Sequence, residues 1–209
     1  MTDSEAFVAQ RRRHTQALAG SQPKGRVIGE SMGRLRRTIA LVGMMGAGKS
    51  AVGKRLAARL GVEFRDADGE IEQAAGCSIS EIFDRYGENA FREGERKVIA
   101  RLLHEPPHVL ATGGGAFIHE TTRAEIAAHA ISVWLNVPLD ILVARVGRRD
   151  SRPLLRNGDL REIMERLLAE RGPIYATADI RIDGEDGPHS AAVECIIGAL
   201  DARDLLEPP

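Results

Sequence analysis

The amino-acid sequence predicts an α/β fold in which a parallel sheet is covered by helices on both faces. From residue 38 onward, short apolar runs alternate with longer stretches of helical periodicity, and this alternation is typical of parallel sheets. A glycine-rich loop joins the first apolar run to the first helical stretch, which is the usual setting of a phosphate-binding loop. The 209 residues, 43% of them hydrophobic, suffice for one domain with a substantial core.

Five strands and seven helices are expected in this domain. Ser78 and Glu81 form a capping box that predicts the start of the second helix. Ligands of parallel α/β sheets bind beyond the carboxyl ends of the strands, so the residues after each strand are the candidate site. The predicted strands are 38–43, 62–65, 109–112, 131–135 and 180–182, and the predicted helices are about 50–60, 79–85, 88–104, 121–128, 139–148, 159–171 and 190–203.

The loop at 43–50 reads Gly-Met-Met-Gly-Ala-Gly-Lys-Ser and fits the phosphate-loop pattern G-x-x-x-x-G-K-[ST]. Its glycines allow backbone N–H groups to face an anion, and the N-terminus of the next helix adds a positive dipole. Lys49 is expected to reach the terminal phosphates, and Ser50 to offer its hydroxyl to Mg²⁺. A plain glycine-rich turn is the alternative, but the fit of all fixed positions between a strand and a helix argues against it. We therefore expect binding of a nucleoside triphosphate.

Two carboxylates, Asp66 and Asp68, come directly after the second predicted strand. If this segment is extended, their side chains share one face, so that Asp66 assists Mg²⁺ while Asp68 faces an acceptor hydroxyl. An Asp-x-Asp pair by itself usually marks a solvated turn. Its position on the phosphate side of the sheet favours the functional interpretation.

The third predicted strand opens into three successive glycines, Gly113, Gly114 and Gly115. Three glycines cost chain entropy, which indicates that the backbone passes close to another group. The sequence leaves two interpretations open, a ligand held against this backbone or a flexible turn.

Three arginines, Arg92, Arg152 and Arg171, suit a phosphotransferase. Most arginines are solvated surface residues, but a guanidinium fork is the best partner for a carboxylate or for a phosphoryl group in transfer. The segment 148–159 is rich in arginine and contains a proline and a glycine. It is predicted to be a mobile lid that closes over the phosphates and excludes water.

Residues 1–37 differ in charge from the rest of the chain. They hold eight Lys or Arg against three Asp or Glu, a net charge of +5, whereas the remainder carries −6. With weak apolar periodicity, this predicts a basic, flexible extension that precedes a folded domain at 38–209. Nucleic-acid binding is not expected, because the extension lacks interleaved aromatic residues and the chain shows no recognisable nucleic-acid module.

Composition also bears on location. No apolar run approaches the roughly 20 residues of a membrane span, and the N-terminus lacks the apolar segment of a secretory signal. A cytoplasmic protein without a membrane partner is therefore expected. Cys77 and Cys195 have neither a disulfide framework nor metal-ligand spacing, and reduced thiols are expected.

The ordered set of motifs resembles the shikimate kinases, over residues 38–183. The resemblance implies a P-loop kinase fold of the nucleoside monophosphate kinase type, with three layers (α/β/α), a five-stranded parallel sheet, a substrate-binding region and a lid. It also implies transfer of the γ-phosphoryl group of ATP to the 3-hydroxyl of shikimate, giving shikimate 3-phosphate and ADP on the route to chorismate and aromatic amino acids. The motifs that carry the resemblance are the loop at 43–50, Asp66-Ala67-Asp68, Phe91-Arg92 with Glu95, Thr112 to Gly115, Arg152 to Leu155, and Glu170-Arg171.

The resemblance implies that Lys49, Asp68 and Arg152 are catalytic. Asp68 would accept or steer the proton of the attacking hydroxyl, while Lys49 and Arg152 would stabilise charge on the moving phosphoryl group. A loose phosphoryl-transfer transition state needs alignment and charge compensation more than covalent chemistry, so no protein nucleophile is required.

The resemblance also implies how shikimate is held. Arg92 and Arg171 would bind its carboxylate, with Glu95 orienting Arg92, while Asp68 and the backbone at Gly114 would take its hydroxyls. The implied shikimate-binding residues are Asp68, Arg92, Gly113, Gly114, Gly115 and Arg171.

On the nucleotide side, the resemblance implies that Ser50 holds Mg²⁺ together with Asp66, directly or through water. Arg145 would lie near the adenine. Ala51 stands where many family members have a second threonine, and the retained Ser50 keeps the magnesium hydroxyl. The implied ATP-binding residues are Gly46, Ala47, Gly48, Lys49, Ser50, Ala51 and Arg152.

Three other classes fit less well. A GTPase would use the pattern D-x-x-G at 66–69, but the chain has no Asn-Lys-x-Asp segment to read guanine. A gluconate or nucleoside monophosphate kinase would share fold, loop and lid, whereas the triple glycine and paired arginines favour a small hydroxy acid. A regulator that senses ATP or binds nucleic acid would have no need of the acceptor residues. A monomer is expected, because the family's site is complete within one chain.

Overall fold

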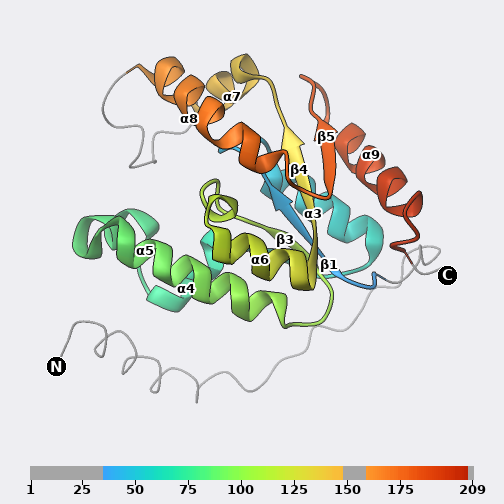
Figure 1. The fold of residues 1–209 in the computed structure, drawn as a ribbon, viewed down its shortest axis with the longest axis horizontal. Helices are drawn as coiled ribbons and strands as arrows, with labels where there is room; N and C mark the ends of the chain where they lie inside the picture. The colour runs from blue at the N-terminus through green and yellow to red at the C-terminus, as the bar shows by residue number, and fades with distance from the viewer. Residues whose placement is uncertain (1–34, 148–158, 207–209) are drawn as a thin grey trace. The chain divides into compact units, whose positions relative to one another are not determined.

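Five short strands form one parallel sheet in the order β2-β3-β1-β4-β5 (Figure 1). The structure is a computed structural model, and it describes residues 35–147 and 159–206. All four strand pairings are parallel, which confirms the predicted fold class. The strands are β1 (Thr38–Val42), β2 (Phe64–Asp66), β3 (Val109–Ala111), β4 (Ala130–Asn136) and β5 (Ile180–Asp183).

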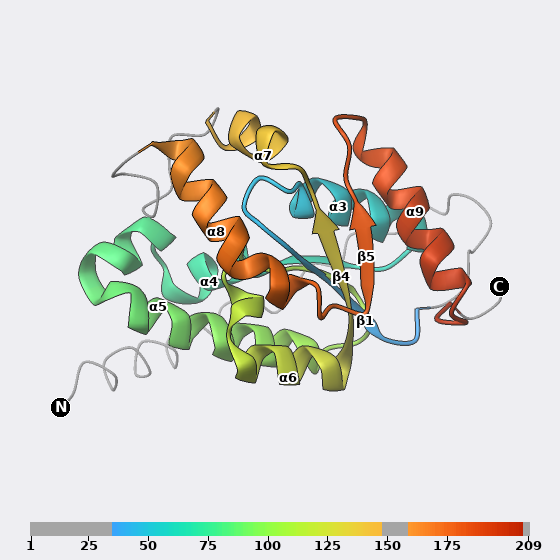
Figure 2. The same cartoon turned by 45° about the horizontal axis from the view of Figure 1, so that its top comes forward.

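Helices cover both faces of the sheet (Figure 2). On one face α3 and α9 pack against each other, and on the other face α5 packs on α6, which contacts β4. Between α7 and α8 lies the predicted lid, whose residues 148–158 are outside the described part of the chain. The helices are α3 (Lys49–Leu60), α4 (Ala67–Ala75), α5 (Ile79–Leu103), the 3-10 turn η1 (Ala116–Ile118), α6 (Glu120–His129), α7 (Leu139–Val146), α8 (Leu160–Tyr175) and α9 (His189–Asp201).

The central strand β1 is buried along its whole length, with Ile39 to Val42 showing no exposed surface. It ends at Val42 and is followed by Gly43, whose φ of 131° favours glycine. A Cβ atom on Gly43 would lie 2.8 Å from the Leu135 carbonyl oxygen and 3.2 Å from Cδ1 of Trp134. The phosphate loop therefore leaves the sheet tightly against β4, where a side chain would collide with the neighbouring backbone.

The helix α4 was not predicted from the sequence, and the expectation that Asp66 and Asp68 lie in one extended segment is wrong. Asp66 ends β2 and is the N-cap of α4, where its Oδ1 accepts a hydrogen bond from the Asp68 N–H at 3.2 Å. Asp68 therefore lies in the first turn of the helix, where a negative side chain complements the helix dipole. Only Ala67 and Ile71 of this helix are buried, so the sequence carries little apolar periodicity there.

Helix α5 joins two stretches that the sequence separates. Gly87 has φ 77° and ψ 172°, and this non-helical residue kinks the helix at the predicted gap between 79–85 and 88–104. The predicted capping box is confirmed: the Ser78 hydroxyl accepts from the Glu81 N–H at 3.2 Å, and the Glu81 carboxylate accepts from the Ser78 N–H at 2.9 Å. Helix α8 continues through Pro173 to Tyr175, four residues beyond its predicted end.

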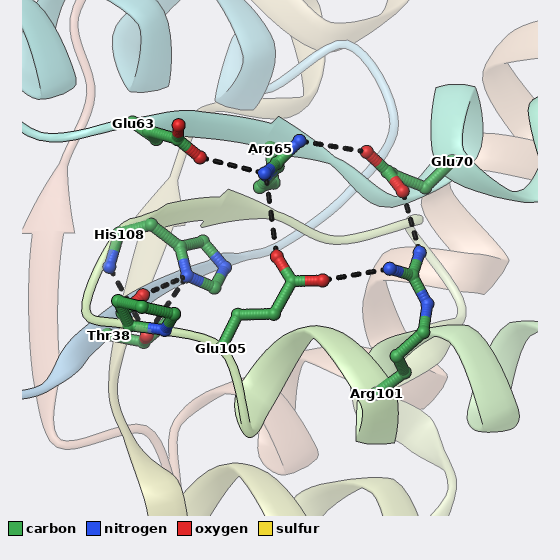
Figure 3. A network of polar contacts seen from close by, with 8 residues as sticks. Thr38, Glu63, Arg65, Glu70, Arg101, Glu105 and His108 are labelled. Atoms are coloured by element: carbon green, nitrogen blue, oxygen red, sulfur yellow. Dashed lines mark hydrogen bonds and ion pairs between the residues drawn. The ribbon is translucent and has the colours of Figure 1, made fainter. Parts of the chain in front are cut away.

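A charge network links α4 to β2 and to the C-terminal end of α5 (Figure 3). Arg65 on β2 lies 2.7 Å from Glu63, 3.5 Å from Glu70 and 3.6 Å from Glu105. Arg101 on α5 completes the ring with contacts of 2.6 Å to Glu70 and 2.8 Å to Glu105. Because Glu70 lies two residues after Asp68, the network fixes the turn that carries this carboxylate.

Residues 35–37, which the sequence analysis placed in the extension, contact the folded domain. Leu35 is buried in the core and pairs with Leu206 in an antiparallel bridge. The Arg37 guanidinium donates to the carbonyl oxygens of Ala127 and Ala128, each at 2.9 Å, at the C-terminal end of α6. Leu35 and Arg37 thus pack against the folded domain. Residues 1–34 lie outside the described part.

The packing of α3 on the sheet leaves no room for a side chain at Gly53. A Cβ atom there would lie 2.6 Å from the Phe64 ring and 3.2 Å from Leu41, so Gly53→Ala is expected to lower the free energy of unfolding by about 1–3 kcal/mol. The matched control Gly198→Ala in α9 meets nothing within 4 Å and is expected to raise it by up to about 1 kcal/mol. Urea unfolding measures both changes, and equal stability of the two variants would contradict this account.

Candidate functional site

Two clefts meet at the carboxyl ends of the strands. The first, here called the phosphate-loop cleft, has a volume of about 430 Å³ and is bordered by Lys49, Ser50 and Asp66. The second, the arginine cleft, has a volume of about 340 Å³ and is bordered by Arg92 and Arg171. Two residues line both clefts: Asp68 and Gly114.

Lys49 lies at the centre of the phosphate loop. Gly46 (φ 81°) and Gly48 (φ 92°) occupy the left-handed region, and Gly48 is the N-cap of α3. The loop therefore curls around the Lys49 ammonium group, which donates to the carbonyl oxygens of Gly43 at 2.8 Å and Met44 at 2.9 Å. With only 8% of its surface exposed, Lys49 is held at the N-terminus of the helix.

Ser50 and Asp66 are brought together from α3 and β2. The Ser50 hydroxyl donates to Oδ2 of Asp66 at 2.6 Å. One hydroxyl and one carboxylate oxygen therefore lie next to each other at the border of the cleft that Lys49 also lines. Within residues 35–147 and 159–206, no cluster of three or more His, Cys, Asp or Glu side chains could hold a metal. A pair of oxygen donors nevertheless fits Mg²⁺, which takes one or two protein ligands and completes its octahedron with phosphate and water.

Arg92 is held as a cation by two glutamates on its own helix. Its Nη1 donates to Glu95 at 2.8 Å and its Nη2 to Glu88 at 3.1 Å. Burial disfavours the guanidinium charge, but the two carboxylates outweigh it and raise the pKa of Arg92. Glu95 is only 1% exposed, and burial raises its pKa even though the pairing with Arg92 opposes the shift. The arginine cleft thus presents a fixed positive group to an anionic ligand.

The three glycines after β3 lie against the site's own side chains. A Cβ atom on Gly113 would lie 2.5 Å from Oε1 of Glu95 and 3.0 Å from Oδ1 of Asp68, and one on Gly115 would lie 2.6 Å from the Arg92 guanidinium. None of the three glycines has a positive φ. The requirement for glycine is therefore close approach rather than backbone conformation, and the groups approached belong to the protein.

Helix α8 adds two donors that converge on one carbonyl. Nη1 of Arg171 lies 3.5 Å from the Gly114 carbonyl oxygen, and the Tyr175 hydroxyl also donates to this oxygen. Sequence analysis missed Tyr175, because the predicted helix ended at residue 171. The four-residue spacing from Arg171 was the available signal, since side chains at i and i+4 share a helix face. Burial raises the pKa of Tyr175 to about 12, which keeps the hydroxyl a neutral donor.

Arg145 and His189 border the phosphate-loop cleft beside the loop itself. From the position of a Cβ atom on Gly48, Cε1 of His189 lies at 3.1 Å and Nη1 of Arg145 at 3.8 Å. Burial, together with the charges of Arg145 and Arg55, lowers the pKa of His189. The sequence reasoning named Arg145 for this side of the site but missed His189, which comes after a proline at the start of α9 and carries no motif.

The remaining predicted site residues divide into four groups. Gly46, Gly48 and Ala51 line the phosphate-loop cleft, while Gly113 and Gly115 line the arginine cleft. Ala47 is buried and does not border either cleft. Arg152 lies outside the described residues.

Glu95 is expected to make the stability of the domain depend on pH. Its pKa in the folded protein lies above the ordinary value of 4.5 because the carboxyl group is buried, so the folded protein binds this proton more tightly than the unfolded chain. The free energy of unfolding should therefore fall as the pH rises from 4.5 through the folded-state pKa. The Glu95→Gln variant should lack this contribution. Urea unfolding across that range measures the difference between the two proteins, and a constant difference would contradict the assignment.

Comparisons with known proteins agree on one family. The sequence model of the shikimate kinase family matches residues 45–201. The chain is 57% identical over 174 residues to the shikimate kinase of Paramagnetospirillum magneticum, covering 83% of this chain and 89% of the relative. With the shikimate kinase of Caulobacter vibrioides it shares 55% identity over 175 residues, covering 83% and 88% of the two chains.

Comparison with solved structures supports the same family. The fold is similar to that of a shikimate kinase from Acinetobacter baumannii in complex with shikimate, with a TM-score of 0.78 and 36% sequence identity. That match covers 80% of this chain and 94% of the other. Both the sequence and the fold therefore lead to one conclusion: the chain belongs to the shikimate kinase family.

Proposed function

We propose that this protein transfers the γ-phosphoryl group of ATP to the 3-hydroxyl of shikimate, giving shikimate 3-phosphate and ADP. The observation that carries the proposal is the junction of the two clefts. Asp68 and Gly114 line both of them, so an acceptor in the arginine cleft can face a phosphate in the other. Family membership favours shikimate over gluconate and nucleoside monophosphates as the acceptor.

Arg92 and Arg171 are proposed to bind the shikimate carboxylate. They lie on different helices, α5 and α8, and border the same cleft. The Glu95 and Glu88 carboxylates hold the Arg92 guanidinium in place, which reduces the entropy that binding must overcome. A ring held by its carboxylate at this end presents its hydroxyls toward Asp68.

Asp68 is proposed to orient the attacking hydroxyl and to accept its proton. It lies in the first turn of α4, and the Arg65 network fixes the same turn. Arg92, Arg171 and Asp68 therefore align the acceptor at both of its ends. Such alignment is the main requirement of phosphoryl transfer through a loose transition state.

Lys49 and Ser50 are proposed to serve the phosphates. Lys49 now bonds two loop carbonyls, and in the complex its ammonium group would bond phosphate oxygens from the same place. Ser50 and Asp66 would hold Mg²⁺, which supplies charge neutralisation on the phosphates when bound. Arg152 is proposed to add a further positive charge from the lid, and Arg145 to lie near the adenine.

We also propose that the protein is a cytoplasmic monomer that binds neither membranes nor nucleic acid. In the part of the chain that the structure describes, no helix is long and apolar enough to cross a membrane. All groups assigned to the reaction belong to one chain.

Sedimentation equilibrium tests whether the protein is a monomer. Deletion of residues 1–34 should leave phosphoryl transfer unchanged.

The decisive experiment measures ADP release by the purified protein with ATP and Mg²⁺. Shikimate is compared with gluconate, nucleoside monophosphates and no acceptor. Release that requires shikimate, and that is lost in Lys49→Ala and Asp68→Asn variants, is the expected result. ADP release with a different acceptor would mean that the arginine cleft binds that acceptor instead of shikimate. No ADP release with any acceptor, despite ATP binding, would reject the proposal.

Charge removal on the two sides of the junction should have different kinetic effects. Arg92→Ala is expected to raise the KM for shikimate by about 10–100-fold, since a charged hydrogen bond contributes roughly 1.5–3 kcal/mol, while the KM for ATP stays within about twofold. Lys49→Ala should instead lower kcat. Arg96→Ala, on the same helix as Arg92 but outside both clefts, is the matched control and should match the wild type. An unchanged shikimate KM in Arg92→Ala would refute the division of roles.

A further inference from the structure

We propose that Tyr175 is a positioning residue for acceptor recognition. Its hydroxyl donates a hydrogen bond to the Gly114 carbonyl oxygen, and this leaves the Arg171 guanidinium available to bind the acceptor's carboxylate. The inference rests on the proposed function, because it assigns Arg171 to a carboxylate. Tyr175 itself borders neither cleft. It therefore acts through Gly114 and Arg171 rather than by touching the substrate.

Two donors compete for one carbonyl oxygen. Arg171 and Tyr175 lie one turn apart on α8 and both direct a donor at the Gly114 oxygen. Arg171 is at 3.5 Å, which is at the outer limit of a hydrogen bond, whereas Tyr175 makes the direct bond. The hydroxyl thus satisfies the carbonyl, and the guanidinium fork keeps most of its donors for the cleft that Arg171 borders.

The Tyr175 hydroxyl is also a fixed point. The side chain has no exposed surface. Its ring packs against the rings of Phe117, at 6.5 Å between centroids, and Trp134, at 6.1 Å. The hydroxyl lies 3.9 Å from the Met44 sulfur in the phosphate loop. Tyr175 therefore holds the loop after β3 at a set distance from the phosphate loop.

Removal of the hydroxyl would change the partner of the Gly114 carbonyl. The carbonyl would retain Arg171 as its nearest side-chain donor, and a charged donor makes the stronger hydrogen bond. Arg171 would then move toward the carbonyl and away from the acceptor. Removal of the hydroxyl should therefore weaken binding of the acceptor's carboxylate and leave nucleotide binding unchanged.

Tyr175→Phe tests this role, because it keeps the stacked ring and removes only the hydroxyl. The expected result is a rise of about 10–100-fold in the KM for shikimate, the range for one hydrogen bond to a charged group, with the KM for ATP within about twofold of wild type. The chain has two tyrosines, and the exposed Tyr86 provides the matched control. Tyr86→Phe should leave both values unchanged.

A second comparison separates this role from a general loosening of the loop. The carboxamide of shikimate lacks the negative charge, so the wild-type protein should prefer shikimate to it. Tyr175→Phe should reduce this preference by the same factor by which it raises the shikimate KM. Equal weakening of both acceptors would show that Tyr175 has only a structural role and would overturn the proposal.

A double-mutant cycle gives an independent test. In an Arg171→Ala background, Tyr175→Phe should have no further effect on the shikimate KM, because the group it acts through is gone. Additive effects would contradict the proposal. If Tyr175→Phe fails to fold, 3-fluorotyrosine in a Tyr86→Phe background replaces Tyr175 alone and keeps its hydroxyl. Shikimate should then shift the ¹⁹F resonance more than the carboxamide does, and equal shifts would overturn the proposal.

These outcomes are distinguishable from failure of the proposed function. If the wild-type protein phosphorylates shikimate and Tyr175→Phe is indistinguishable from it, only the role of Tyr175 is refuted. If the wild-type protein does not phosphorylate shikimate, the proposed function fails and the assignment of Arg171 fails with it.

Discussion

The site depends on the close approach of two backbones, the loop after β3 and the phosphate loop after β1. A Cβ atom on Gly114 would lie 3.2 Å from the Met45 nitrogen and 3.8 Å from the Gly43 oxygen. The approach is possible because β1 and β3 are parallel neighbours whose carboxyl ends meet at one edge. Thr112 strengthens it, since its N–H and its hydroxyl both donate to the Leu41 carbonyl, at 3.1 and 3.0 Å. The junction of the two clefts is a consequence of this contact.

Around that contact, the cationic side chains form hydrogen bonds or ion pairs with oxygen atoms of the protein. Lys49 is enclosed by carbonyl oxygens, and Arg92 by the Glu95 and Glu88 carboxylates. A buried charge is costly when it is unpaired, so these partners make it possible to keep cations beside the sheet. The arrangement is preorganised for anionic ligands, which is the main way in which proteins stabilise charge during phosphoryl transfer.

Much of this was predictable, because the signals are local. The apolar runs predicted all five strands, and the glycine pattern predicted the start of α3 to within one residue of its observed start at Lys49. The gap at Gly87 predicted the break in α5, where only a residue without a side chain easily adopts φ 77° and ψ 172°. Helix α4 escaped prediction because it buries only Ala67 and Ile71 and is stabilised by the Asp66 cap and by ion pairs from Arg65 and Arg101. Arg65 lies five residues before Glu70, whereas Arg101 reaches Glu70 from 31 positions away, on α5.

By itself the sequence determined the five strands, most of the helices, the phosphate loop and the set of charged residues at the strand ends, because periodicity and motif spacing are properties of neighbouring residues. Tertiary structure alone decided which of those residues meet. It placed Glu95 and Arg92 against Gly113 and Gly115, and it brought Tyr175 to the Gly114 carbonyl over 61 positions of sequence. Such contacts are set by strand order and by the packing of helices on the sheet, and neither leaves a local signal.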